Sequence, residues 1–189
     1  MRYIARGLAF TTTAEAGPGT MRAAVPIPPS HHGHDLGRWP LHSALTLAAV
    51  EGSVPSARAH LRQQLLEWGQ AEVSQDAGAV VTELVANAVT AAAGLGPAAV
   101  PVLIWLGSDG HCVLLAVADA NPRPPVRLNP GPDAEGGRGL ALVEAFSSRW
   151  GWYPASIAGL VKAVWAEWRL PTEAGQRPST SLPGRCHAA

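Results

Sequence analysis

Glu83 and Asn87 place a carboxylate and a carboxamide four residues apart within the segment EVSQDAGAVVTELVANAVTAAAG. Residues four apart are neighbours on one face of an α-helix, so the two side chains lie side by side if this segment is helical. The amide oxygen can complete the octahedral shell of Mg²⁺, which usually keeps several waters and takes further ligands from phosphates. The carboxylate can accept a proton from an incoming hydroxyl or water. A Glu/Asn pair is also common on solvated helix faces, so the pair alone leaves both interpretations open.

A second stretch that could do chemistry is DAEGGRGLALVEAF (133–146), where Gly136, Gly137 and Gly139 surround Arg138. Apolar side chains then recur at helical spacing: Leu140, Val143, Phe146 and Trp150. A helix is therefore predicted to begin between Arg138 and Leu140. Glycines let backbone N–H groups approach an anion, and a helix start adds unpaired N–H donors and the positive end of the helix dipole. The stretch predicts a phosphate cradle, although a plain hinge or turn uses similar residues.

Two common nucleotide motifs are missing from the sequence. Neither GxxxxGKS/T nor a strand-linked GxGxxG occurs. Their absence argues against the commoner nucleotide-binding folds.

Asp119 ends the apolar run HCVLLAVAD, directly before ANPRPP. A carboxylate at the mouth of a core can accept a hydrogen bond from the exocyclic amine of adenine, whereas guanine would present an acceptor to an acceptor. The other interpretation is an Asx turn that closes the strand. Residues 122–139 are too rich in Pro and Gly for a regular element, and loops of this length are often functional lids.

The histidines, the single lysine and the tryptophans have plainer interpretations. His31, His32 and His34 have no organised fourth ligand, so no metal site is predicted there. Lys162 could pair with a phosphate, but a strand lysine is usually a solvated edge charge, and we expect that here. The tryptophans are expected to fill the core, with one or two at a partner surface. They are Trp39, Trp68, Trp105, Trp150, Trp152, Trp165 and Trp168.

The chain around these residues predicts the elements that must position them. ALTLAAV (44–50) predicts a strand, and Gly52, Ser53 and Pro55 suit a helix start. A first helix follows, with Gly69 at its end. Its apolar residues recur at helical spacing: Ala57, Leu61, Leu65 and Trp68.

The segment that holds Glu83 and Asn87 predicts a second helix with two distinct faces. At about 100° per residue, one face is apolar and the opposite strip is polar. The apolar face comprises Ala77, Val81, Leu84, Val85 and Ala88. The polar strip comprises Asp76, Glu83, Asn87 and Thr90, flanked by Ala79, Val80 and Ala86.

The remaining apolar runs predict strands. PVLIWLG and HCVLLAVAD flank the turn sequence SDG and predict an antiparallel hairpin. WGWY and VKAVWAEWRL predict two further strands. The order strand, helix, helix, hairpin, helix, hairpin predicts an α+β fold: a two-layer α/β sandwich with helices on one face of a mixed, mostly antiparallel sheet. A doubly wound sheet would need strands and helices to alternate throughout.

Length and composition narrow the classes of protein further. The 189 residues fit one ordinary domain, 41–170, between a disordered N-terminal arm, 1–40, and a disordered tail, 171–189. Fourteen basic and fourteen acidic residues give no net charge, so no direct nucleic-acid or membrane partner is expected. Cys112 and Cys186 show no disulfide or metal spacing, and no signal peptide or membrane span is predicted. A cytoplasmic location is the expectation.

Four segments resemble, in order and spacing, conserved boxes of the histidine-kinase-like ATPase (GHKL) superfamily. They are ELVANAV, VADANP, EGGRGLALVEAFSSRWGW and VKAVWAEW. The resemblance runs from about Ala44 to Leu170, and the nearest likeness is to bacterial anti-sigma-factor serine/threonine kinases and the stand-alone ATP-binding regulatory proteins of actinobacteria. It implies a sandwich of the Bergerat type that binds ATP and Mg²⁺.

The resemblance also implies roles for individual residues. Glu83 would be the base that activates a substrate serine, and Asn87 the Mg²⁺ ligand. Asp119 would contact the adenine amine. The other implied nucleotide contacts are Asn121, Gly136, Gly137, Arg138, Gly139 and Leu140. In the related kinases the phosphate goes to a serine of a small antagonist protein, and the kinase otherwise sequesters a sigma factor; a homodimer is left open.

Three positions depart from the family pattern. AVTAAAG follows Asn87 where relatives often have a basic residue or histidine. Asn121 and Pro122 stand where the superfamily has glycine; asparagine tolerates a left-handed backbone, but proline stiffens the next step. Ala163 stands where relatives commonly have threonine, which removes a hydroxyl that could reach the base through water.

Three functions therefore compete. The first is a Mg-ATP-dependent protein serine/threonine kinase with Glu83 as base. The second is a non-catalytic ATP-dependent module that captures a sigma factor or another regulator. The third is an interaction domain without nucleotide, which would need four boxes to agree by accident.

Overall fold

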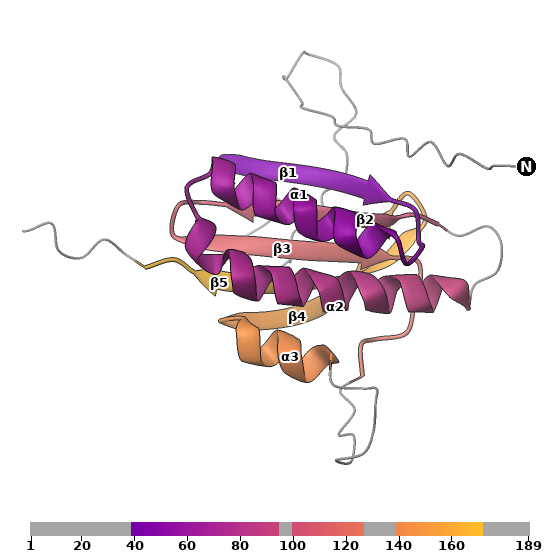
Figure 1. The fold of residues 1–189 in the computed structure, drawn as a ribbon. Helices are drawn as coiled ribbons and strands as arrows, with labels where there is room; N and C mark the ends of the chain where they lie inside the picture. Colours follow the sequence, from indigo (N-terminus) through magenta and orange to yellow (C-terminus); the bar gives the residue numbers. More distant parts are fainter. Residues whose placement is uncertain (1–38, 95–99, 127–138, 172–189) are drawn as a thin grey trace, which may run out of the picture.

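The computed structural model describes residues 39–94, 100–126 and 139–171. Along these residues the chain forms the predicted succession of strand, helix, helix, hairpin, helix and hairpin (Figure 1). The elements are β1 (Leu41–Leu47), α1 (Ser53–Glu67), the 3₁₀ turn η2 (Ala71–Val73), α2 (Ser74–Ala93), β2 (Val102–Ser108), β3 (Cys112–Asp119), α3 (Gly139–Phe146), β4 (Arg149–Ile157) and β5 (Leu160–Arg169).

The strands form one sheet in the order β1-β2-β3-β5-β4, with all three helices on one of its faces (Figure 1). This arrangement confirms the predicted two-layer α+β sandwich. Each strand pair among the described residues is antiparallel, whereas the order of elements in the sequence predicts a mixed, mostly antiparallel sheet. The central strand β3 is buried along its whole length, with side chains packed in clusters on both of its faces.

The core on the helical side follows from the period of two along β3. Val113, Leu115 and Val117 point toward the helices and pack with Leu61 of α1 and Val81 of α2. The apolar faces predicted for α1 and α2 are buried, except that Trp68 follows the end of α1 and is only partly buried. Burial of these faces, rather than helix propensity, holds both helices on the sheet.

Two of the alternate residues of β3, Cys112 and Leu114, form a second cluster with Trp39 and Trp105 on the other face of the sheet. The Trp105 ring lies over Gly107, where an added Cβ would come within 2.3 Å of it. Trp39 meets Trp105 edge to face, with ring centroids 5.7 Å apart. The prediction that tryptophans fill the core is thus confirmed for this pair.

Two turns follow the local sequence closely. Gly69 follows the end of α1 with a φ of 71°, which suits glycine, and the N–H of Gln70 donates to the carbonyl of Leu65 as in a Schellman motif. In the β2–β3 hairpin, Gly110 has a φ of 82°. The Asp109 carboxylate accepts hydrogen bonds from the backbone N–H groups two and three residues after it, those of His111 and Cys112.

Element boundaries differ from the predictions in two places. β1 covers 41–47 instead of 44–50, because its pairing with β2 fixes its extent. α3 ends at Phe146, so the prediction that Trp150 continues its apolar face is wrong, and Trp150 lies in β4. The hydrogen bond from the Trp168 indole to the carbonyl of Phe146 ties this helix end to the sheet.

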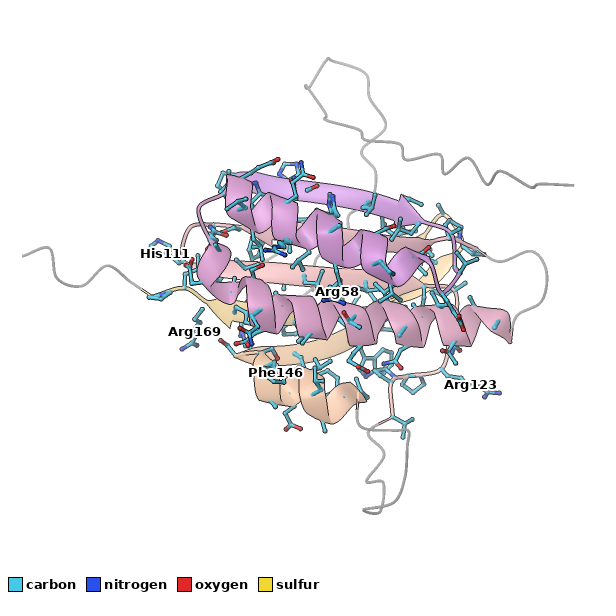
Figure 2. The ribbon with its side chains drawn as sticks, in the orientation of Figure 1. Arg58, His111, Arg123, Phe146 and Arg169 are labelled. Atoms are coloured by element: carbon cyan, nitrogen blue, oxygen red, sulfur yellow. The ribbon has the colours of Figure 1, made fainter. Side chains whose placement is uncertain are left out.

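The ends of the predicted arm and tail, 1–38 and 172–189, lie outside the described residues. Arg123 lies at one end of the described fold, and His111 and Arg169 lie at the other (Figure 2). None of the helices within the described ranges is long and apolar enough to cross a membrane.

Candidate functional site

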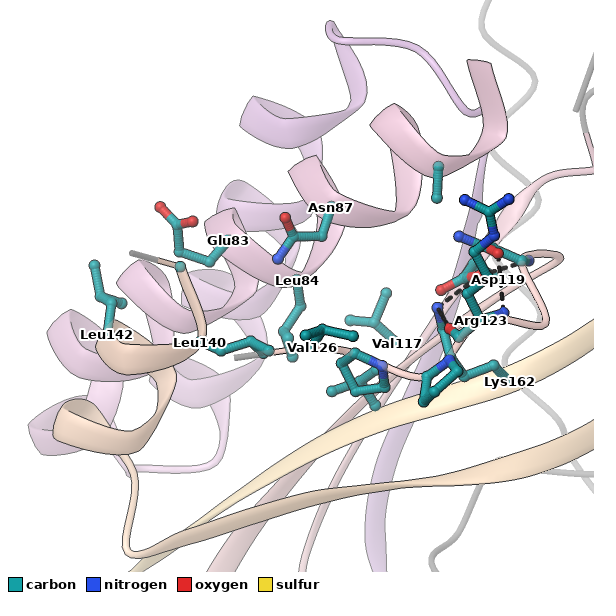
Figure 3. Close-up of a pocket in the computed structure, with 16 residues that line it drawn as sticks. Glu83, Leu84, Asn87, Val117, Asp119, Arg123, Val126, Leu140, Leu142 and Lys162 are labelled. Atoms are coloured by element: carbon teal, nitrogen blue, oxygen red, sulfur yellow. Dashed lines mark hydrogen bonds and ion pairs between the residues drawn. The ribbon is translucent and has the colours of Figure 1, made fainter. Parts of the chain in front are cut away.

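A cavity of about 490 Å³ opens between α2, the start of α3 and the ends of β3 and β5 (Figure 3). Its volume lies within the range of small-molecule binding sites. Six of the residues singled out from the sequence line it: Glu83, Asn87, Asp119, Asn121, Gly139 and Leu140. Gly136, Gly137 and Arg138, the centre of the predicted phosphate cradle, lie outside the described residues.

Glu83 and Asn87 form the α2 side of the cavity. Glu83 is half-buried and Asn87 is exposed, whereas Leu84, between them in sequence, is buried against the sheet. Both polar side chains extend from α2 toward the start of α3 (Figure 3). The Glu83 and Asn87 part of the predicted strip therefore borders the cavity, whereas Asp76 and Thr90 do not line it.

Gly139, the first residue of α3, makes this meeting of α2 and α3 possible. A Cβ built at Gly139 would lie 2.6 Å from Oε2 of Glu83 and 3.5 Å from Nδ2 of Asn87. A contact of 2.6 Å is far below van der Waals separation. The missing side chain therefore leaves room for the carboxylate beside the first backbone groups of the helix.

Asp119 lies at the far end of the cavity from Glu83 (Figure 3). Its Oδ1 accepts a hydrogen bond of 2.8 Å from the backbone N–H of Asn121, so the Asx turn expected as the other interpretation is present. Asn121 repeats the pattern and accepts from the N–H of Arg123 at 3.0 Å. Within the described residues Oδ2 of Asp119 accepts no hydrogen bond, so the turn leaves one oxygen available to a ligand.

The departure at Asn121 and Pro122 has a simple structural outcome. Among the described residues, Ala158 is the sole non-glycine with a positive φ. Asn121 therefore does not use the left-handed backbone that asparagine tolerates. The two successive side-chain turns, at Asp119 and Asn121, set the direction of the chain toward Arg123 instead.

Burial raises the pKa of Asp119, and the Asn121 N–H and Lys162 act against that rise. The side chain is only 7% exposed. A carboxylate in such surroundings is stabilised chiefly by its few neighbours. A ligand atom that contacts Oδ2 therefore has a large influence on the pKa of Asp119.

Two expectations about β5 are wrong. Lys162 is not a solvated edge charge: it is 8% exposed, lines the cavity and lies 3.5 Å from Asp119. Ala163 faces away from the cavity and packs with Ala118 and Leu160 on the other face of the sheet. A hydroxyl at position 163 would not reach the cavity, and the β5 side chain that points into it is Lys162.

The alternation of residues along β5 indicates that Lys162 faces the helices, although lysines on strands usually lie at solvated edges. Val164, Ala166 and Trp168 alternate along β5 and pack on the helical side, and Lys162 has the same parity. Asp119 has the parity of the helix-facing residues of β3. The register that sets Asp119 opposite Lys162 was not visible in either strand alone.

The cavity has an apolar middle and two polar ends. Leu84, Val117, Leu140 and Val164 line it between the ends. Asp119 and Lys162 form one polar end, and Glu83, Asn87 and Gly139 form the other. An elongated ligand with a flat, partly apolar group at one end and polar groups at the other fits this division.

The residues at the Glu83 end also suit a magnesium ion. The Asn87 oxygen is a hard ligand of the type that Mg²⁺ takes together with water and phosphate. Within the described residues, no three His, Cys, Asp or Glu side chains gather into a metal site of their own.

Comparison with known proteins agrees with this geometry. A family model of the histidine kinase-like ATPase domain matches residues 45–159. The match covers more than half of the chain, and the chain belongs to this family. ATP is the nucleotide that membership in this family implies.

A search of solved structures returns the crystal structure of the RsbU and RsbW domains of Rv1364c from Mycobacterium tuberculosis. Sequence identity is 23% and the TM-score is 0.49. The match covers 68% of this chain and 31% of that chain. A search of curated proteins finds no match.

Proposed function

We propose that this protein binds Mg-ATP and transfers the γ-phosphate to a serine of a partner protein, as a kinase of the anti-sigma-factor type. The observation that carries the proposal is the placement of Glu83 at one end of a single cavity and Asp119 at the other. The Asp119 end then binds the adenine of the nucleotide, and Glu83 at the other end is the proton acceptor.

At the base end, Oδ2 of Asp119 accepts a hydrogen bond from the 6-amino group of adenine. Leu84, Val117 and Val164 provide apolar surface for the ring, and burial of that surface favours binding. The low exposure of Asp119 keeps water from competing for its oxygen.

At the phosphate end, Glu83 acts as general base. The serine Oγ attacks the γ-phosphorus, the bond from that phosphorus to the β–γ bridging oxygen breaks, and ADP leaves. The serine proton passes to the Glu83 carboxylate. A positioned base of this kind contributes about 10²–10⁴-fold to the rate. The room left by Gly139 sets the carboxylate beside the start of α3.

Asn87 would hold the Mg²⁺, which neutralises charge on the phosphates when bound. Gly136, Gly137 and Arg138 remain proposed phosphate contacts on the strength of the sequence resemblance. The same resemblance supports an antagonist protein, a sigma factor or both as partners.

The direct test incubates the protein with γ-labelled ATP, Mg²⁺ and an antagonist protein encoded beside it, and measures label on the partner's serine. Glu83→Gln removes the base, so we expect transfer to fall about 10²–10⁴-fold while ATP affinity is retained. Glu72→Gln, an exposed glutamate in η2, is the matched control and keeps full transfer.

Nucleotide binding without any transfer by the parent protein would refute the kinase. It would leave the ATP-dependent capture module as the function. Equal transfer by Glu83→Gln and the parent would refute Glu83 as the base.

A further inference from the structure

Lys162 is a buried cation at the Asp119 end of the cavity, where adenine is proposed to bind. It lies directly opposite Asp119 in the register between β3 and β5. Its ammonium nitrogen is 3.5 Å from Oδ1 of Asp119, and the two side chains are 8% and 7% exposed. Both line the cavity, so the pair faces whatever occupies it.

The ammonium group is held in place, yet one of its donors remains free for a ligand. Its Nζ donates to the backbone carbonyl of Arg123 at 2.9 Å and lies beside the Asp119 carboxylate. An ammonium carries three N–H donors. Within the described residues no third acceptor contacts Nζ, so one N–H can point into the cavity.

The acceptor and the donor stand side by side at the end of an apolar cavity. Adenine presents the complementary pair on neighbouring atoms, because its 6-amino group donates and its ring N1 accepts. Building on the proposed ATP binding, we propose that Lys162 is a second base-recognition residue, which donates a hydrogen bond to N1 while Asp119 accepts one from the 6-amino group.

The pair also predicts discrimination against 6-oxopurines. Hypoxanthine and guanine carry a carbonyl at position 6 and an N–H at position 1. In the same orientation, position 6 is therefore an acceptor instead of a donor, and position 1 is a donor instead of an acceptor. The carbonyl would face the carboxylate, and the N–H would face the ammonium. Sites built to hydrogen-bond one pattern reject the opposite pattern strongly.

The test compares the affinity for ATP with that for 1-deaza-ATP, in which a C–H replaces N1. A hydrogen bond from a charged donor supports an affinity loss of about tenfold or more in the parent protein. In Lys162→Met both nucleotides should bind alike, at about the affinity of the parent for 1-deaza-ATP. Arg169→Met, an exposed cation at the other end of β5, is the control and should keep the preference for ATP.

A second readout does not depend on any variant. Lys162 is the only lysine in the chain, so lysine-selective ¹⁵N labelling gives a single Nζ resonance. ATP should shift this resonance distinctly from the shift that 1-deaza-ATP produces. This measurement decides the question even if Lys162→Met fails to fold.

Equal affinity of the parent protein for ATP and 1-deaza-ATP would overturn the role of Lys162 and leave ATP binding intact. An Nζ resonance that responds identically to the two nucleotides would do the same. Failure of the parent to bind either nucleotide would overturn the proposed function together with this inference.

Discussion

The two oxygens of Asp119 have different surroundings. Oδ1 closes the Asx turn and lies next to Lys162, while Oδ2 stays available at the cavity end. The sequence predicted the position of this acid well, because an apolar run that stops at a carboxylate marks the end of a buried strand. Its cationic neighbour could not be predicted, because Lys162 is 43 residues away in sequence and only the strand register brings the two together.

The raised pKa of Asp119 predicts a pH dependence of nucleotide affinity. The ionised carboxylate is the acceptor for the adenine amine, so affinity is full above the pKa of Asp119 and falls as pH decreases through it. Because burial raises that pKa, the loss begins at a higher pH than for an ordinary aspartate, whose pKa is 3.8. ATP titrations from neutral to acid pH measure it.

Asp119→Ala serves as the reference in the same pH series, because protonation of ATP itself affects both proteins equally. The parent should lose more affinity on acidification than the variant does. Parallel pH profiles for the two proteins would show that protonation of Asp119 does not affect the binding of adenine.

At the scale of elements, α2 carries Glu83 and Asn87, the residues proposed to act on the phosphates, and α3 begins beside them at Gly139. The faces of α2 followed from periodicity, and the start of α3 was predicted within one residue. Their close approach was not predictable, since it depends on the space that Gly139 leaves for Glu83 in the folded protein. In the sequence that glycine looked equally suited to a hinge.

Gly139→Ala should therefore impair transfer more than stability. The added methyl group displaces the Glu83 carboxylate, which is the flexible end of its side chain, so the fold can accommodate the change. We expect phosphate transfer to fall at least tenfold, with a change in unfolding free energy of about 1 kcal/mol or less. Transfer assays and thermal unfolding measure the two effects.

Gly78→Ala is the matched control within α2. A Cβ at Gly78 meets no atom within 4 Å. Alanine should stabilise the helix by about 0.5–1 kcal/mol and leave transfer unchanged. Full transfer by Gly139→Ala would contradict the proposed closeness of Glu83 to the start of α3.

A strand residue gives a prediction about stability alone. The Tyr153 hydroxyl on β4 is buried without a hydrogen-bond partner among the described residues, and burial raises its pKa. An unpaired buried hydroxyl costs about 1–3 kcal/mol, so Tyr153→Phe should raise the unfolding free energy by about 1 kcal/mol or more. Denaturant unfolding of the two proteins tests this. Destabilisation would show that the hydroxyl makes a favourable interaction.

At the scale of the whole molecule, the sheet separates two sides that are packed differently. The helical side carries the cavity, and the opposite side carries the Trp39 and Trp105 cluster. The order of elements predicted the sandwich, because amphipathic helices and apolar strands must cover one another. The side on which each β5 residue lies was harder to predict, as Lys162 and Ala163 show, because both faces of the inner strands are buried and the apolar alternation is weak.

The central claim is that a single cavity binds ATP with the base at Asp119. It is tested most directly by calorimetric titration of Mg-ATP into the parent protein and into Asp119→Ala. Saturable one-to-one binding by the parent, weakened at least tenfold in Asp119→Ala and unchanged in Asp76→Ala, is the predicted result. No binding by the parent, or equal binding by the parent and Asp119→Ala, would contradict it.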